Sequence, residues 1–194
     1  MTNFSTRYDL SEAERIGAAI GAALMPGDVV ALSGDLGAGK TTLARAMLKA
    51  RGLAGEAPSP TFAIVQPYAP PEVDLPIAHV DLYRIEGEDE LIELGLDDYL
   101  YDGALLIEWP ERLGASGWPE ALLLAISGDG DARVLTASVP PAWGARWPLR
   151  SFRPPMRPRF LPRMAGAMPR FCRSPAMRRS AAISASSTAT GRRC

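Results

Sequence analysis

Cysteine, histidine and long apolar runs are all scarce in this chain of 194 residues. The only two cysteines, Cys172 and Cys194, lie late in the sequence, so residues 1–140 can form neither a disulfide nor a thiolate metal site. The first residues lack the apolar core of a signal peptide, and no apolar run approaches the ~20 residues that a membrane helix requires. These absences predict a cytoplasmic protein with no membrane contact.

Negative charge is missing from the end of the chain. All 22 acidic residues and 9 of the basic residues lie before position 140, whereas residues 141–194 have 12 arginines and no lysine, aspartate or glutamate. The net charge is therefore −13 for residues 1–140 and +12 for the rest. The acidic part offers no basic patch for a phosphate backbone, which argues against direct nucleic-acid binding by it. We expect one domain over 1–140 and a disordered tail over 141–194.

Strand-like and helix-like segments alternate along residues 1–140. Ser11 and Glu14 have the spacing of a capping box, and Pro26 and Gly27 would end the helix that follows. Apolar or alternating runs predict strands at 28–33, 77–80, 104–107, 121–126 and 133–139, with helical patterns at 41–49 and 88–94. Such alternation predicts an α/β fold with a mostly parallel sheet flanked by helices.

A complete phosphate-binding pattern joins the strand at 28–33 to the helix at 41–49. Its residues are Gly34, Asp35, Leu36, Gly37, Ala38, Gly39, Lys40 and Thr41, and Thr42 follows them. The glycines let backbone N–H groups point at phosphate oxygens, the lysine reaches the β- and γ-phosphates, and the threonine hydroxyl coordinates Mg²⁺. The helix behind the loop directs its positive end at the anion. This context predicts a P-loop NTPase-like protein that binds ATP and Mg²⁺ and hydrolyses the ATP.

Two carboxylates are candidates for the metal site and for catalysis. Asp81 ends the run 77–80 and Glu108 ends the run 104–107. Residues at the carboxyl ends of strands face the ligand crevice of an open α/β sheet, and a P-loop site needs an acidic residue there for Mg²⁺. We expect Thr41, Asp81 and Glu108 at the metal, and Lys40, Asp81 and Glu108 in catalysis. How the two carboxylates divide the metal and the attacking water is open.

Four other residues have less specific patterns. Ser59 and Thr61 place two hydroxyls beside a proline, which is typical of a loop that senses the γ-phosphate but equally of a simple strand start. His79 lies inside an apolar run, which favours a packed or hydrogen-bonded histidine over a catalytic one. Trp109 follows Glu108 and is interpreted as covering the core.

Four segments in this order resemble the motifs of the bacterial TsaE family, the ATPase subunit of the machinery that makes threonylcarbamoyladenosine in tRNA. They are the phosphate loop through Thr42, Ser-Pro-Thr-Phe at 59–62, His-Val-Asp-Leu-Tyr-Arg at 79–84 and Ile-Glu-Trp-Pro-Glu-Arg at 107–112. The resemblance covers roughly residues 8 to 140. By this match, Ser59 and Thr61 would belong to a switch-like loop beside the nucleotide.

The resemblance implies a function and partners. Members of the family hydrolyse ATP weakly alone and act with the TsaD and TsaB subunits. The complex places a threonylcarbamoyl group on the adenosine next to the anticodon of certain tRNAs, and tRNA would be contacted mainly through the partners. By match of motif, Lys40 would hold phosphate and Glu108 would be the main catalytic residue. The Mg²⁺ site would take Thr41, Asp81 and Glu108.

Two other functions stay open on the residues alone. A P-loop kinase for a small molecule would need an acceptor pocket and a lid with arginines, neither of which the sequence displays clearly. A nucleotide-gated binding module would hydrolyse ATP only incidentally. Control of partner affinity by the nucleotide state would identify the binding module.

The tail over 141–194 has no counterpart in the resemblance. One hypothesis is a basic, disordered arm that touches tRNA. The other, which we prefer, is a shifted reading frame, because arginine without lysine or acids is what GC-rich coding sequence yields in the wrong frame. Back-translating residues 174–185 with GC-rich codons and shifting by one nucleotide can give a peptide that resembles the start of an aminoglycoside-kinase-type phosphotransferase domain. Some TsaE-like proteins carry such a domain fused behind them.

The shifted-frame hypothesis makes a prediction about the gene. Sequencing it should reveal an insertion or deletion upstream of the codons for residues 174–185, with the phosphotransferase-like peptide in the alternative frame. An intact downstream frame without any insertion or deletion contradicts the hypothesis and leaves the basic arm.

Overall fold

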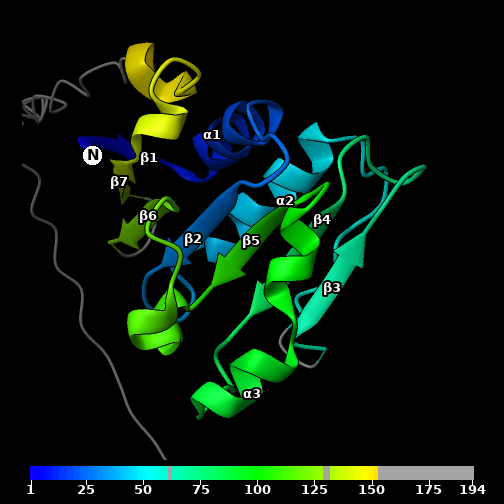
Figure 1. The fold of residues 1–194 in the computed structure, drawn as a ribbon. Helices are drawn as coiled ribbons and strands as arrows, with labels where there is room; N and C mark the ends of the chain where they lie inside the picture. The colour runs from blue at the N-terminus through cyan, green and yellow to red at the C-terminus, as the bar shows by residue number, and fades with distance from the viewer. Residues whose placement is uncertain (61–62, 129–131, 153–194) are drawn as a thin grey trace, which may run out of the picture. The chain divides into compact units, whose positions relative to one another are not determined.

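The computed structural model describes residues 1–60, 63–128 and 132–152 (Figure 1). The strands are β1 (Thr2–Tyr8), β2 (Val29–Ser33), β3 (Val65–Tyr68), β4 (Ile77–Asp81), β5 (Ala104–Glu108), β6 (Leu122–Ser127) and β7 (Arg133–Val139). The helices are α1 (Leu10–Ala22), α2 (Lys40–Ala50) and α3 (Glu88–Glu93). Short 3₁₀ helices follow at η1 (Leu96–Leu100), η2 (Pro110–Ser116), η3 (Pro141–Trp143) and η4 (Pro148–Ser151). Across these described ranges, no helix is long and apolar enough to cross a membrane.

Seven strands form one mixed sheet in the order β1-β7-β6-β2-β5-β4-β3 (Figure 1). The pairs β6–β2, β2–β5 and β5–β4 are parallel, and the pairs β1–β7, β7–β6 and β4–β3 are antiparallel. The expected α/β architecture is thus confirmed, with parallel pairing confined to the four central strands. Because β2, β5 and β4 run in the same direction, their carboxyl ends meet at one edge of the sheet.

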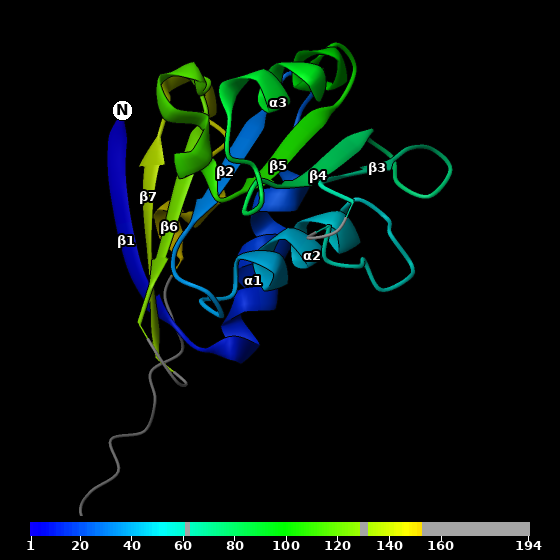
Figure 2. The ribbon, with the colours of Figure 1, turned by 90° about the horizontal axis from the view of Figure 1, so that it is seen from below.

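Helices cover both faces of the sheet. Figure 2 shows α1 and α2 side by side on one face and α3 on the other, and each face has its own apolar core. The two helices approach closely because α1 carries glycines where α2 passes. A Cβ atom at Gly17 would lie 2.5 Å from the Cβ of Ala46, and one at Gly21 would lie 2.5 Å from the carbonyl oxygen of Met47.

Helix α1 begins two residues earlier than its sequence pattern predicts. Asp9 is the cap: its Oδ1 accepts the N–H of Glu12 at 3.1 Å, and Oε2 of Glu12 accepts the N–H of Asp9 at 2.9 Å. Ser11 instead donates its hydroxyl to Asp9 at 2.6 Å. The cause is strand β1, which the sequence analysis did not predict. It pairs with β7 as far as Tyr8, so the chain turns into the helix immediately afterwards.

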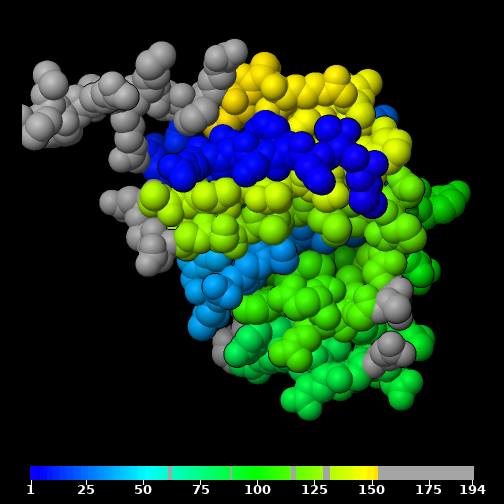
Figure 3. Space-filling model, turned by 90° about the vertical axis from the view of Figure 1, so that its left-hand side faces the viewer, coloured from blue at the N-terminus to red at the C-terminus, as the bar shows by residue number. Residues whose placement is uncertain are grey.

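Residues 141–152 pack against the domain, which differs from the expected boundary at residue 140. Trp143, Trp147 and Leu149 are buried in the core beneath α1, and the ring of Trp147 meets that of Phe4 edge-on at 5.8 Å. Figure 3 shows this segment, in yellow, along β1 at the edge of the sheet. Residues 153–194, the rest of the expected tail, lie outside the described residues.

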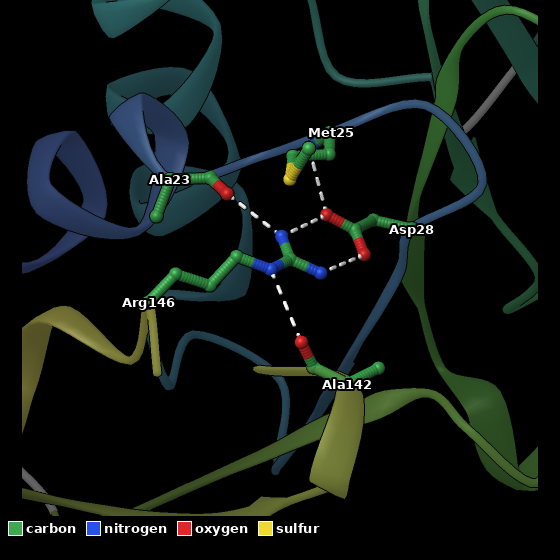
Figure 4. A network of polar contacts seen from close by, with 5 residues as sticks. All are labelled: Ala23, Met25, Asp28, Ala142 and Arg146. Carbon is green, nitrogen blue, oxygen red and sulfur yellow. Dashed lines mark hydrogen bonds and ion pairs between the residues drawn. The ribbon is translucent and has the colours of Figure 1, made fainter. Parts of the chain in front are cut away.

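Arg146 fastens this segment to the start of β2 (Figure 4). Its guanidinium donates to both carboxylate oxygens of Asp28, at 2.5 and 2.6 Å, and to the carbonyl oxygen of Ala23 at 2.7 Å. The carboxylate also accepts the N–H of Met25 at 2.7 Å. Asp28 is buried, and the guanidinium lies 4.2 Å from the ring centroid of Trp143. The planar fork of arginine suits this two-point contact, which a lysine would not reproduce.

The Arg146 contact predicts a stability effect far from the phosphate loop. Arg146→Ala should lower the free energy of unfolding by about 2–3 kcal/mol, because Asp28 would remain buried without its cation. Urea unfolding of the full chain measures this. Arg150→Ala is the matched control, since Arg150 is exposed in the same segment and its removal should change stability by less than ~0.5 kcal/mol. Equal effects of the two changes would contradict the anchoring role.

Candidate functional site

The phosphate loop connects the end of β2 to the start of α2. Gly34, Gly37 and Gly39 have positive φ angles of 139°, 78° and 108°, a region that glycine enters without steric cost. Gly34 also lacks room for a side chain, because a Cβ atom there would collide with the carbonyl oxygen of Ile126 at the end of β6. Gly39 is the cap of α2, so the helix starts directly behind the loop. The first N–H groups of a helix have no partner within it, which makes this end an anion site.

Lys40 folds back over the loop that precedes it. Its Nζ donates to the carbonyl oxygens of Gly34, at 2.7 Å, and Asp35, at 3.0 Å, and lies 3.7 Å from the ring centroid of Trp109. The residue is only 4% exposed. Burial lowers the pKa of the Lys40 ammonium. The nearby carboxylates that oppose this pKa shift belong to Glu108, Glu111, Asp81 and Asp35.

Glu108 lies at the centre of the predicted metal site. It ends β5, is 2% exposed, and has a partner for each carboxylate oxygen. Oε2 accepts the Thr41 hydroxyl at 2.9 Å, and Oε1 lies 2.9 Å from Nε2 of His79. The parallel register of β4 and β5 places Asp81 opposite Glu108. The structure therefore brings Thr41, Asp81 and Glu108 together, as the sequence predicted, while their roles stay predictions.

Asp81 is held in place by the turn that follows β4. Its side chain is buried, and its Oδ1 accepts the N–H of Tyr83 at 3.0 Å. The backbone N–H of Asp81 donates to the carbonyl oxygen of Ile64 at 2.9 Å. The Tyr83 ring packs on that of Trp109, with centroids 5.0 Å apart. The same turn thus orients the carboxylate of Asp81 and supports the indole that covers Lys40.

The oxygen donors fit a Mg²⁺ ion that is shared with a bound phosphate. The Thr41 hydroxyl and the carboxylates of Asp81 and Glu108 are the hard ligands that Mg²⁺ prefers. Within the part of the chain that the structure describes, no group of three or more His, Cys, Asp or Glu side chains could hold a metal by itself. Mg²⁺ is usually bound by one or two carboxylates together with phosphates and water.

The tip of the phosphate loop is open to solvent. Asp35 and Gly37 are exposed, and Leu36 is 83% exposed. Ala38 is buried, and its carbonyl oxygen accepts Nε of Arg133 from the start of β7 at 2.8 Å. Arg133 had no role in the sequence analysis. No local signal could have identified it, because only the order of the sheet brings β7 near the loop.

The other predicted nucleotide contacts lie on the α2 side of the loop. Thr42, in the first turn of α2, lines a cavity of about 350 Å³ together with Arg45, Ala46 and residues 54–57. Nε of Arg45 donates to the carbonyl oxygen of Ala57 at 2.7 Å and so fixes one wall. Ser59 is exposed two residues further on. Thr61 lies outside the described residues.

Two residues interpreted as structural belong to this site. Trp109 covers Lys40 rather than only the core, and its φ of 62° shows that the chain turns sharply directly after Glu108. His79 is hydrogen-bonded, as expected, but its partner is Glu108. A signal for both is present in the sequence, since each is within two residues of a predicted site carboxylate.

Comparisons with known proteins show which family the chain resembles over most of its described length. Residues 8–134 match the family model described as threonylcarbamoyl adenosine biosynthesis protein TsaE. The tRNA threonylcarbamoyladenosine biosynthesis protein TsaE of Bacillus subtilis is 41% identical over 107 residues, which cover 55% of this chain and 65% of that protein. The protein of the same name from Haemophilus influenzae is 45% identical over 107 residues, covering 54% and 66%. The chain thus spans less than two thirds of the length of these relatives.

A solved structure shares the fold. The crystal structure of YdiB from Bacillus subtilis superposes with a TM-score of 0.61 and 30% sequence identity. The superposition covers 75% of this chain and 92% of that chain. The similarity therefore extends over nearly the whole of the solved protein.

The lowered pKa of Lys40 predicts how stability changes with pH. Because the folded state holds the Lys40 proton less tightly than the unfolded chain, this residue contributes a rise in stability as pH increases towards the ordinary lysine range. As the pH rises towards the ordinary lysine pKa of about 10.4, the unfolding free energy of the wild type should rise relative to that of Lys40→Met. Lys49→Met, at an exposed position of the same helix, should follow the wild type. Parallel curves for all three proteins would contradict a buried Lys40 ammonium.

Proposed function

Since this chain belongs to the TsaE family, whose model matches residues 8–134, we propose that it is the Mg²⁺-dependent ATPase of a tRNA-modifying complex. It would support the threonylcarbamoyl modification of the adenosine next to the anticodon and act with TsaD and TsaB. The observation that carries the proposal is the contact between the Thr41 hydroxyl and Glu108 at 2.9 Å, directly behind a complete phosphate loop.

Phosphate binding rests on the loop and on Lys40. The ammonium lies among backbone carbonyls and over an indole ring, where it is largely removed from water. Burial lowers the pKa of this group, so a polyanion that restores a favourable environment for the ammonium gains binding free energy there. The backbone N–H groups at the start of α2 add uncharged donors for the same phosphates.

The Mg²⁺ site would use the three oxygen-bearing side chains at the ends of α2, β4 and β5. Thr41 would ligate the ion directly, with Asp81 and Glu108 on the ion or on its water ligands. When bound, Mg²⁺ neutralises the charge that develops on the phosphate oxygens. The Thr41 hydroxyl donates a hydrogen bond to Glu108, so the lone pairs of its oxygen stay available for the metal.

Hydrolysis needs a group that orients the attacking water, and the two carboxylates are the candidates. Glu108 is our first choice for the catalytic residue, with Asp81 at the metal. Both are buried at the same strand edge as Lys40. Orientation and electrostatic stabilisation account for most of the catalysis in phosphoryl transfer, so fixed carboxylates suit this reaction.

Contact with tRNA is assigned mainly to the partner subunits. Residues 1–140 carry a net charge of −13, and phosphate backbones bind to basic surfaces. We therefore expect this acidic protein to contact the partner subunits rather than the nucleic acid directly. The names of the relatives connect them with the same tRNA modification.

Phosphate release from ATP by the full chain tests the proposal, with and without a purified TsaD–TsaB pair. Hydrolysis should be slow alone and faster with the pair. Lys40→Ala and Glu108→Ala should lower the rate by about 10²–10³-fold, as the loss of a group that stabilises the transition state does. Arg7→Ala, at an exposed position of strand β1, is the control and should keep the wild-type rate. ATP binding without phosphate release, or a rate indifferent to the pair, would contradict the proposal and favour a nucleotide-gated binding module.

A further inference from the structure

His79 is the only histidine of the chain, and it lies completely buried in strand β4, between β5 and the edge strand β3. It precedes Asp81 by two positions, so both side chains point to the same face of the sheet, the face that α2 covers. Nε2 of His79 lies 2.9 Å from Oε1 of Glu108 on the neighbouring strand. The imidazole therefore sits directly behind the carboxylate that contacts Thr41.

The direction of the hydrogen bond follows from the two groups. An ionised carboxylate can only accept, so Nε2 of His79 carries the proton and donates it. The other ring nitrogen, Nδ1, is buried and has no hydrogen-bond partner among the described residues. A lone pair at Nδ1 is consistent with this, because an N–H there would be a buried donor without an acceptor.

Core packing alone does not explain an imidazole at this position. An aliphatic side chain would fill the same place without burying two ring nitrogens, one of which gains no hydrogen bond. Among the described residues, the hydrogen bond that the ring makes is directed at Glu108. The hydrogen bond to Glu108, a residue of the nucleotide site, thus offsets part of the free-energy cost of burying the imidazole.

We propose that His79 is a positioning residue of the nucleotide site, a role that rests on the proposed function. Its Nε2–H holds Oε1 of Glu108, which leaves Oε2 facing the Thr41 hydroxyl. A carboxylate held at both oxygens cannot rotate, so the Thr41 hydroxyl keeps its proton directed at Oε2 of Glu108 and its oxygen lone pairs available for the metal. His79 itself touches neither metal nor nucleotide. It acts only through Glu108, as the partners behind metal ligands commonly do.

A pair of amide variants separates positioning from packing. In His79→Gln, the amide nitrogen takes the place of Nε2 and can still donate to Glu108. In His79→Asn, the amide takes the place of Nδ1 and ends short of the carboxylate. Both variants keep a polar side chain in the core, so they differ mainly in the contact with Glu108.

The measurement is binding of the fluorescent nucleotide mant-ATP, in Mg²⁺ and in EDTA. His79→Asn should weaken the Mg²⁺-dependent binding by about 10–100-fold and leave the binding in EDTA unchanged, while His79→Gln should stay near the wild type. Equal losses in Mg²⁺ and in EDTA, or no loss in His79→Asn, would overturn the positioning role. Absence of Mg²⁺-dependent binding in the wild type would overturn the proposed function and the role of His79 with it.

A second measurement needs no change at position 79. Because the chain has one histidine, a ¹⁵N NMR spectrum of the full protein with labelled histidine contains signals from one imidazole only. The signals should report a proton on Nε2, and Glu108→Gln should shift the Nε2 signal more than that of Nδ1. A proton on Nδ1 with none on Nε2 would overturn the proposal even if the variants at position 79 fail to fold.

Discussion

The hydrogen bond between the Thr41 hydroxyl and Glu108 joins the first turn of α2 to the end of β5, and the rest of the site depends on it. It fixes the distance between the phosphate loop and the strand edge that carries both carboxylates. Lys40 directly precedes Thr41, and Trp109 directly follows Glu108. His79 supports the same carboxylate from β4. One buried glutamate thus connects the loop, two parallel strands and the only histidine.

A second, independent contact constrains the other end of strand β2, away from the phosphate loop. Arg146 links the start of β2 to the segment that follows β7, and the tryptophans at 143 and 147 close the core beneath β1 and α1. Strand β2 therefore has the phosphate loop at its carboxyl end and the Arg146 contact at its amino end. Both ends of the strand that leads into the loop are fixed, which suits a loop whose backbone N–H groups must keep their orientation.

The reliable predictions concerned residues whose neighbours in sequence determine their surroundings. The glycines, Lys40 and Thr41 lie between a strand and a helix, as predicted, because strand, loop and helix are contiguous. Asp81 and Glu108 were placed at strand ends by the apolar runs before them, and parallel pairing brought them together. Strands β1 and β3 escaped prediction, since edge strands that pair on one side need no continuous apolar run. The cap of α1 was misplaced for the same reason, because the end of β1 determines where that helix begins.

By itself, the amino-acid sequence determined the phosphate loop, the two carboxylates, the α/β class and the resemblance to the TsaE family. These depend on short-range patterns, where residue type and spacing leave few alternatives. Only the tertiary structure decided that His79 contacts Glu108, that Arg133 contacts the phosphate loop and that residues 141–152 belong to the domain. Each of these results from contacts between segments far apart in the chain, and the order and register of the strands, which no local pattern encodes, select the partners.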